Sequence, residues 1–256
     1  MLHHKQKPLV SIITITYNSE SSIEDTIGSL LNQTYSNIEY IIVDGNSSDK
    51  TVSIINSYTE KIKERNIMLK FLSENDEGIA DAWNKGLKLA TGDIIGMLNS
   101  DDWFDDNSIE SAVNCLDIKK AQLSYGICYR VNDKKEVIEI MNREFNPNLL
   151  YLNFGFSYTT CFVTKKMYNT IGLYNLNYKI AIDTDFLLRA YNHGFKFIKC
   201  SNITYMRLGG VSTKFKKAAL KEHQQAMMSN GFNPILIFIF GMVKKGVLIL
   251  QNLKLI

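Results

Sequence analysis

The stretch that decides the fold is Leu9-Val10-Ser11-Ile12-Ile13-Thr14-Ile15-Thr16, a short run in which β-branched residues predominate. Such a run is typical of a strand that is buried on both faces of a sheet. Because it is short and β-branched, it is unlike a signal-peptide core, and we expect neither cleavage nor export. Similar runs at residues 38–43, 67–72 and 93–98 predict three further strands.

Apolar residues recur at helical spacing between these runs, within residues 23–31, 52–62 and 79–90. Strands that alternate with helices in this way predict an α/β fold with a mostly parallel central sheet. In such sheets ligands bind beyond the carboxyl ends of the strands. The loops at those ends are polar, and we expect them to converge on one binding rim; they are residues 17–20, 44–49, 73–78 and 99–102.

The second half of the chain has a mixed pattern. Residues 108–119 and 183–191 are expected to form helices, and residues 123–130 are expected to pair with residues 137–141 in a hairpin. Residues 234–256 are strongly apolar, but their longest uncharged run is shorter than the roughly 20 residues that span a bilayer. Attachment to a membrane surface and burial as a C-terminal helix both stay open for this tail.

Composition excludes other classes of protein. The chain has 256 residues, of which 45% are hydrophobic, so it can bury a substantial core. Lysine and arginine number 29 against 26 acidic residues, a balance that predicts no nucleic-acid partner. The four cysteines are far apart, which predicts neither a zinc site nor a disulfide framework and indicates a reduced cytosolic protein. Nothing in the sequence indicates the oligomeric state.

Two adjacent carboxylates, Asp101 and Asp102, end the fourth predicted strand after Asn99 and Ser100. A hard divalent cation is commonly held by one or two such groups while substrate phosphates supply its other ligands. The same pair is as often a turn followed by a helix cap, so the motif by itself leaves both interpretations open.

Tyr17 and Asp44 directly follow the first two predicted strands. The Asp44 carboxylate would accept a hydrogen bond from a uracil-type N–H or a ribose hydroxyl, and Gly45 allows a tight turn. A plain turn is the alternative, with Asp49 as the N-cap of the next helix. Tyr17 would stack on a base, although a single aromatic residue at a rim is more often packing.

Charged pairs mark two helices. Asp81 and Lys85 are four residues apart, which by itself favours a surface ion pair, but the helix N-terminus would face the rim and suits an anionic ligand. Asp183 and Asp185 stand at a helix start, where one of them would serve as a cap. A carboxylate there would also serve as general base toward a sugar hydroxyl.

In this order, these segments resemble family 2 glycosyltransferases of the GT-A fold, in particular the bacterial branch that builds exopolysaccharide, colanic acid, capsule and lipopolysaccharide. The resemblance is carried by residues 10–18, 43–49, 81–86 and 90–102, which span the first half of the chain. Residues 181–189 resemble the acidic acceptor motif of the family. Residues 208–212 are similar to a downstream glycine loop.

The resemblance implies a role for each matching residue. Those implied to bind a nucleotide-sugar donor are Thr16, Tyr17, Asn18, Asp44, Asp81, Lys85, Ser100 and Asp101. Asp101, with Asp102 second, would hold a divalent metal, Mn²⁺ or Mg²⁺, and Asp183 would deprotonate the acceptor. Asn99 replaces the usual first Asp of the metal motif, and Ile182 replaces a Glu that commonly precedes the base.

We therefore expect a Rossmann-like GT-A fold with a nucleotide-sugar-binding half (1–102), a mixed acceptor-binding half (103–213) and a C-terminal helical tail (214–256). The expected activity is that of a metal-dependent, inverting hexosyltransferase. It would move a sugar from a UDP-linked donor to a glycan or lipid-linked acceptor in cell-surface polysaccharide synthesis. The expected location is the cytoplasm, with residues 234–256 contacting the inner face of the plasma membrane.

Two other functions compete with this expectation. A sugar nucleotidyltransferase calls for a glycine- and lysine-rich phosphate loop after the first strand, and residues 17–20 contain neither residue type. A catalytically silent nucleotide-sugar-binding module is supported only by Asn99 and Ile182. A dehydrogenase is disfavoured because no G-x-G-x-x-G motif follows the first strand.

Overall fold

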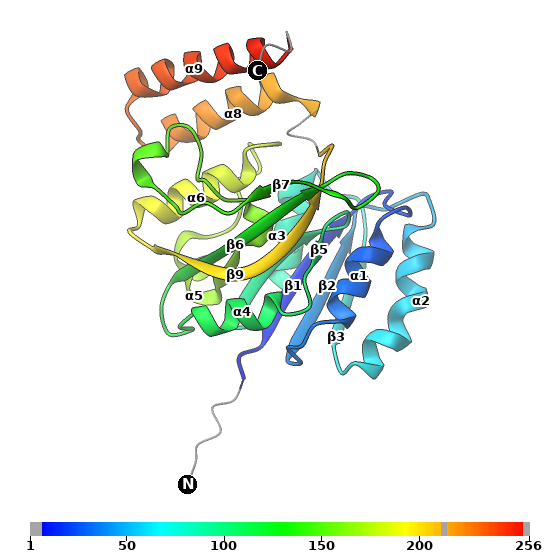
Figure 1. The fold of residues 1–256 in the computed structure, drawn as a ribbon. Coiled ribbons are helices and arrows are strands. Elements are labelled where there is room, and N and C mark those ends of the chain that lie inside the picture. Colours follow the sequence, from blue (N-terminus) through cyan, green and yellow to red (C-terminus); the bar gives the residue numbers. More distant parts are fainter. Residues whose placement is uncertain (1–6, 211–213, 253–256) are drawn as a thin grey trace.

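The computed structural model describes residues 7–210 and 214–252. Its first half alternates strands and helices in the predicted order (Figure 1). The elements are β1 (Val10–Thr16), α1 (Ile23–Leu31), β2 (Ile38–Asp44), α2 (Thr51–Glu64), β3 (Met68–Ser73), α3 (Ile79–Leu89) and β4 (Ile94–Asn99). The predicted strands and helices of this half are confirmed to within about two residues at each end.

The second half is mixed, as expected, and contains more elements than the sequence indicates. They are β5 (Trp103–Phe104), α4 (Ser108–Cys115), β6 (Gln122–Val131), β7 (Val137–Met141), β8 (Phe162–Thr164), α5 (Lys165–Ile171), α6 (Ile182–Asn192), β9 (Lys196–Arg207), α8 (Lys216–Ser229) and α9 (Pro234–Asn252). Short 3₁₀ turns occupy Pro147–Leu149 and Tyr158–Thr160. Of the resemblance at residues 208–212, Val211 and Ser212 lie outside the described residues.

One sheet runs through both halves in the order β3-β2-β1-β4-β8-β6-β9-β5, with β7 added on β6. Strands β1 to β4 are parallel, whereas β8 is antiparallel to both of its neighbours. Thr16 of β1 lies opposite Asp44 of β2, and Ile15 lies opposite Asn99 of β4. This register brings the ends of three strands, and hence three of the polar loops, to one edge.

Helices cover both faces of the sheet. Ile12 belongs to a core with α1, α2 and α4, and Ile13 belongs to a second core with α3, α5 and α6. The alternation follows from the period of two along a strand. The arrangement confirms the predicted α/β sheet with flanking helices.

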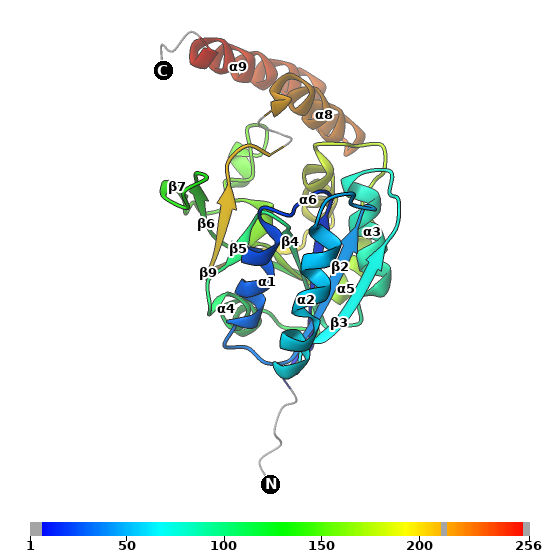
Figure 2. The same cartoon turned by 90° about the vertical axis from the view of Figure 1, so that its right-hand side faces the viewer.

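Helices α8 and α9 form an additional layer at one end of the molecule (Figures 1 and 2). Helix α8 packs on α6, and α9 packs on α8. Strand β1, and with it the parallel strands β2 to β4, runs toward this end (Figure 1). Within the part of the chain that the structure describes, no helix has the length and apolar character needed to cross a membrane.

The expectation of unpaired cysteines is wrong for one pair. Cys115 at the end of α4 and Cys200 in β9 form a disulfide, with their Cα atoms 6.4 Å apart. The two residues are 85 positions apart in sequence and meet because α4 lies along β9. Spacing alone cannot show such a long-range pairing. Cys128 and Cys161 are buried and free.

Candidate active site

The loops after β1, β2 and β4 are tied together by hydrogen bonds. Asn18 Oδ1 accepts from the backbone N–H of Ser48 at 2.9 Å, which joins the first loop to the second. The hydroxyls of Ser19 and Ser100 lie 2.8 Å apart, which joins the first loop to the fourth. Both bonds involve short polar side chains that directly follow a strand. The predicted rim is therefore present.

The loop after β3 joins the same rim. Asn46 Nδ2 donates to Asn75 Oδ1 at 3.1 Å, across the ends of β2 and β3. Gly45 lies so close to this loop that a Cβ atom added there would stand 2.6 Å from Asp76 Oδ2 and 3.4 Å from the Tyr17 ring. A larger residue at this position would require the Asp76 side chain to move. Asp76 therefore belongs to the rim, although its sequence pattern singled out no role for it.

Asp44 is fully buried at the end of β2, with three hydrogen bonds to its carboxylate. The Ser47 hydroxyl donates to Oδ1 at 2.5 Å, and the Ser47 N–H and the Ser73 hydroxyl donate to Oδ2 at 3.0 and 2.7 Å. Because a carboxylate has about four acceptor positions, capacity for one further donor is left. The predicted turn is therefore present, and the carboxylate keeps one acceptor position that no described residue fills.

Thr16 and Tyr17 stand beside Asp44. Thr16 Oγ1 is buried without a hydrogen-bond partner within the described part of the chain. An unpaired buried hydroxyl costs about 1–3 kcal/mol, and a hydrogen-bond partner would relieve that cost. The Tyr17 side chain is 65% exposed and leaves one ring available for stacking. The three residues thus lie together at the ends of β1 and β2.

Lys85 holds the third loop. Its ammonium donates to the Asn75 carbonyl at 2.6 Å and pairs with Glu74 at 2.9 Å and Asp81 at 3.3 Å. The hydrogen bond with Glu74 is the main reason that the pKa of Lys85 is raised. The ion pair of Asp81 and Lys85 is therefore present, and it fixes the loop beside the rim.

Asp102 has a structural environment. It is buried, its Oδ2 accepts from Asn99 Nδ2 at 3.1 Å, and its Oδ1 accepts from the Arg207 N–H at 3.1 Å. Burial, and then the neighbouring charge of Asp101, raise its pKa well above the ordinary value. Asn99 supplies a donor to this carboxylate, which an Asp at the same position would not.

Asp101 has a different environment from its neighbour. It is partly buried, burial raises its pKa, and no other residue of the described chain donates a hydrogen bond to its carboxylate. Its backbone carbonyl accepts from Arg207 Nε at 3.1 Å. The carboxylate is therefore free to bind a ligand, while the backbone is fixed.

The difference between the free Asp101 carboxylate and the hydrogen-bonded Asp102 carboxylate decides which of them could bind a divalent cation. Residues 7–210 and 214–252 contain no group of three or more His, Cys, Asp or Glu side chains that could hold a metal by themselves. One free carboxylate nevertheless suits an ion of the Mg²⁺ type, which is often held by one or two carboxylates together with substrate phosphates. Asp101 fits that role, whereas Asp102 would have to give up its hydrogen bonds.

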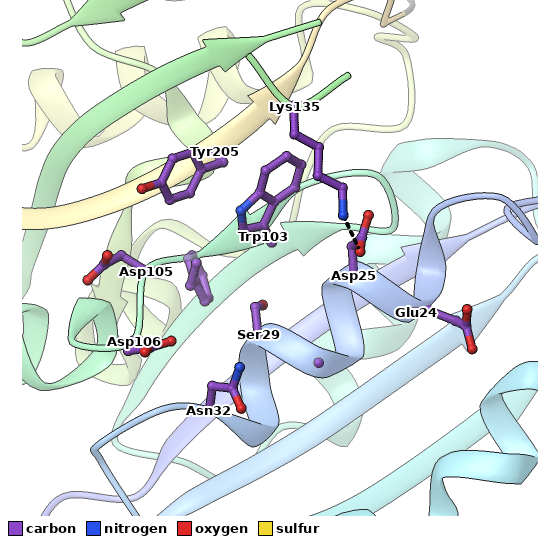
Figure 3. A pocket seen from close by; sticks show the side chains of 11 residues that line it. Glu24, Asp25, Ser29, Asn32, Trp103, Asp105, Asp106, Lys135 and Tyr205 are labelled. Atoms are coloured by element: carbon purple, nitrogen blue, oxygen red, sulfur yellow. Dashed lines mark hydrogen bonds and ion pairs between the residues drawn. The ribbon is translucent and has the colours of Figure 1, made fainter. Parts of the chain in front are cut away.

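A cavity of about 410 Å³ lies behind this turn, against α1 (Figure 3). Asp25 faces Lys135 there, with a 2.7 Å ion pair, and also pairs with Arg207. The Arg207 guanidinium lies over the Trp103 ring, 4.9 Å from its centroid. None of the predicted donor residues lines the cavity, so it is separate from the predicted donor site.

Asp183 is the second residue of α6, and its side chain is partly exposed. Its Oδ1 accepts from the Thr184 N–H at 2.7 Å, and burial raises its pKa. A raised pKa makes the carboxylate a stronger base near neutral pH. Neither Asp183 nor Asp185 caps the helix, since the N-cap is Ala181. Asp185 is buried and forms an ion pair with Arg189 at 2.9 Å.

The segment before Asp183 is anchored from two sides. Glu222 of α8 accepts hydrogen bonds from three consecutive backbone N–H groups, those of Lys179, Ile180 and Ala181, at 3.0, 2.7 and 3.0 Å. Lys179 Nζ donates to the Glu77 carbonyl in the third loop at 2.9 Å. Glu222 was not among the predicted site residues; its one signal in the sequence is that it is the only acidic residue between positions 208 and 246.

The fold and the rim together define a GT-A glycosyltransferase architecture. The model of the family described as glycosyl transferase family 2 matches residues 11–184, and the chain belongs to this family.

Relatives and solved structures agree with this assignment. A PGL/p-HBAD biosynthesis glycosyltransferase of Mycobacterium bovis is 28% identical over 80% of this chain and 79% of its own length. The putative teichuronic acid biosynthesis glycosyltransferase TuaG of Bacillus subtilis is 41% identical, over 46% of each chain. The chain thus matches less than half the length of the second relative.

Two structures share the fold. The S. aureus TarS fragment 1–349 in complex with UDP-GlcNAc has a TM-score of 0.66 and 21% identity, over 91% of this chain and 71% of that one. The mannosyltransferase PcManGT of Pyrobaculum calidifontis, in complex with GDP-Man and Mn²⁺, has a TM-score of 0.66 and 18% identity, over 94% and 70%.

Proposed function

We propose that the chain transfers a sugar, with inversion, from a UDP-linked donor to a hydroxyl of a glycan or lipid-linked acceptor in cell-surface polysaccharide synthesis. The observation that carries the proposal is Asp183, a half-buried carboxylate with a raised pKa that follows a segment whose Lys179 bonds to the third loop. The two relatives are named for PGL/p-HBAD and teichuronic acid biosynthesis, which supports the cell-surface role.

The nucleoside would bind at the ends of β1 and β2. Tyr17 stacks on the base, the remaining acceptor position of Asp44 takes a uracil-type N–H, and the orphaned Thr16 hydroxyl bonds to the nucleoside. Asn18 keeps the first two loops together. The UDP-GlcNAc complex of TarS supports a uridine nucleotide as the donor. The GDP-Man complex of PcManGT makes a guanosine nucleotide the alternative.

The sugar diphosphate would lie along the third and fourth loops. Asp81 and Lys85 border it on one side, and Ser100 and Asp101 border it on the other. A divalent cation held by Asp101 would neutralise the diphosphate leaving group, and the Mn²⁺ in the PcManGT complex supports such an ion. Asp102 supports the turn rather than the ion.

Asp183 would take the proton of the acceptor hydroxyl. The acceptor oxygen then forms a bond to the anomeric carbon as the bond from that carbon to the diphosphate oxygen breaks, which inverts the configuration. An aspartate works as a base when it is deprotonated, so activity falls as pH drops through its pKa. Because that pKa is raised, the fall sets in at a higher pH than for an ordinary aspartate.

The proposed location is the cytoplasm at the inner face of the plasma membrane, with residues 234–256 as the contact, although a disulfide such as Cys115–Cys200 is rare in a reducing cytosol. The proposal on substrates is tested by a screen of nucleotide sugars for Mn²⁺- or Mg²⁺-dependent release of nucleoside diphosphate. A silent binding module would bind a donor without releasing diphosphate. A nucleotidyltransferase would release pyrophosphate from a nucleoside triphosphate and a sugar phosphate.

The assignment of the base is tested with Asp183→Asn. The variant should lose transfer by at least about 1,000-fold, because no other carboxylate replaces the base. Its affinity for the donor should be unchanged, since the Asp183 carboxylate has no hydrogen bond to the nucleoside loops within the described part of the chain. Full transfer activity in the purified variant would remove Asp183 from the mechanism.

A further inference from the structure

Helix α9 presents an apolar face to solvent. Ile235, Phe238 and Met242 are 68%, 65% and 58% exposed, and Ile239 between them is 47% exposed. Their spacing of three and four residues places them on one side of the helix. Large apolar side chains in a contiguous exposed stripe usually mark a surface that another partner covers.

The opposite side of α9 is already occupied. Ile237 is buried, Phe240 stacks on Tyr151 with 5.5 Å between ring centroids, and Gly241 lies against the Gln224 side chain of α8. These contacts hold α9 on the protein by its inner side. The two interpretations of the apolar tail therefore apply to different sides of one helix, since only its inner side is buried.

The surroundings of the stripe are strongly basic. Between positions 208 and 246 the only acidic residue is Glu222, and its carboxylate is engaged by three backbone N–H groups. The exposed lysines of this region are Lys214, Lys216, Lys217, Lys221 and Lys245. A second copy of the chain on the same stripe would bring these like charges together, whereas an anionic surface would neutralise them.

We propose that the outer side of α9, with the exposed lysines around it, docks on an anionic lipid bilayer. The apolar side chains enter the boundary between headgroups and acyl chains, and the lysines bind anionic headgroups. The proposal names the surface that would make the proposed membrane contact. It rests on the proposed function, in the form in which the acceptor is lipid-linked. Because the parallel strands run toward the α8–α9 end (Figures 1 and 2), docking places the rim near the bilayer, where a lipid-linked acceptor resides.

Co-flotation of the full chain with vesicles tests the surface. Vesicles of phosphatidylcholine mixed with phosphatidylglycerol should bind at least about tenfold more protein than vesicles of phosphatidylcholine alone. Phe238→Glu should lower that binding about tenfold. Ile138→Glu is the matched control, because Ile138 is 58% exposed on β7, outside the α8–α9 layer, and its replacement should change nothing.

Charge is tested in the same way. Lys217→Glu should weaken binding to the anionic vesicles. Lys120→Glu should not, because Lys120 is exposed just before β6, away from the α8–α9 layer. Equal binding to neutral and anionic vesicles, or equal losses in Phe238→Glu and Ile138→Glu, would overturn the proposal. Sedimentation velocity that shows a dimer, dissociated by Phe238→Glu and indifferent to vesicles, would assign the stripe to a second copy instead.

The failure of this inference is distinguishable from failure of the proposed function. Release of nucleoside diphosphate from a soluble donor is measured on the same Phe238→Glu protein and should be unchanged, since Phe238 lies outside the donor loops. Vesicle binding without any donor turnover in the wild type would contradict the proposed activity alone. Turnover without vesicle binding would contradict the docking surface alone.

Discussion

The donor side and the acceptor side of the rim are positioned by different means. Asp44 and Asp101 each lie at or just beyond the end of a parallel strand, so the register of β1, β2 and β4 determines where they stand. Asp183 is the second residue of a helix instead, and the segment before it is held by Glu222 of α8 and by the contact of Lys179 with the third loop. The donor side should therefore tolerate changes in the C-terminal layer, and the acceptor side should not.

The largest expected effect on the donor side comes from a substitution of Asp101, with its neighbour Asp102 as the control. Asp101→Ala should lower kcat/KM about 100-fold and abolish the metal-dependent part of donor binding, because it removes the only free carboxylate of the turn. Isothermal titration with Mn²⁺ and UDP measures this effect. The melting temperature should be nearly unchanged, since no other residue of the described chain donates a hydrogen bond to that carboxylate.

Asp102→Ala is the matched control with the opposite pattern. It should lower the free energy of unfolding by about 1–3 kcal/mol, since the Arg207 N–H and the Asn99 amide lose their acceptor. Metal titration of the folded fraction should resemble that of the wild type. Equal losses of metal binding in both variants would restore Asp102 as a ligand and contradict the structural role.

Sequence reasoning succeeded where neighbours in sequence are also neighbours in space. A polar loop that directly follows a buried strand must lie at the end of that strand, and parallel strands gather such ends on one edge. Thr16, Asp44 and Asp101 can for this reason be selected from the amino-acid sequence alone. Their chemical roles stay predictions, but their places on the rim follow from the strand pattern.

The same reasoning could not show which carboxylate of a pair is free. Asp101 and Asp102 look alike in sequence, and only the approach of Arg207 on β9 shows that Asp102 is used internally. Strand β9 itself was missed because Lys196, Lys199 and Arg207 interrupt its apolar pattern. The expected helix 108–119 ends at Cys115, since the next residue, Leu116, is extended.

Glu222 offers the test of the acceptor side. Glu222→Ala should lower kcat about tenfold and leave the KM for the donor unchanged, because the released segment precedes the base and not the nucleoside loops. Asp183 should then be better solvated, so its pKa falls and the acid limb of the pH profile moves to lower pH. Steady-state kinetics across pH measures both effects.

Rescue separates positioning from a general loss of stability. Glu222→Gln keeps an oxygen that can accept from the same N–H groups, and it should recover most of the kcat that Glu222→Ala loses. Glu60→Ala removes an exposed carboxylate on α2 and should change neither kcat nor the pH profile. An equal fall in kcat and in donor affinity for Glu222→Ala would show that it acts on the whole fold.

The smallest effect concerns the layer that carries Glu222. Lys244 of α9 lies with its Nζ 3.1 Å from His223 Nε2, and burial lowers the pKa of Lys244 to about 8. Burial, and then the charge of Lys244, lower the pKa of His223 to about 4. The pKa of Lys244 is thus lower in the folded protein than the unfolded value of 10.5, so the unfolded chain takes up the proton first as the pH falls. The free energy of unfolding therefore decreases as pH falls from about 10.5 to about 8.

At pH 7 the protonated lysine therefore opposes the packing of α9 on α8. Lys244→Met should raise the free energy of unfolding by about 1–3 kcal/mol and flatten its dependence on pH between 8 and 10.5, because the buried charge is gone. Lys245→Met is the adjacent control, and since Lys245 is exposed it should stay within about 0.5 kcal/mol of the wild type. Urea unfolding at several pH values measures both. Equal behaviour of the two variants would show that the buried charge of Lys244 does not lower the stability of the α8–α9 layer.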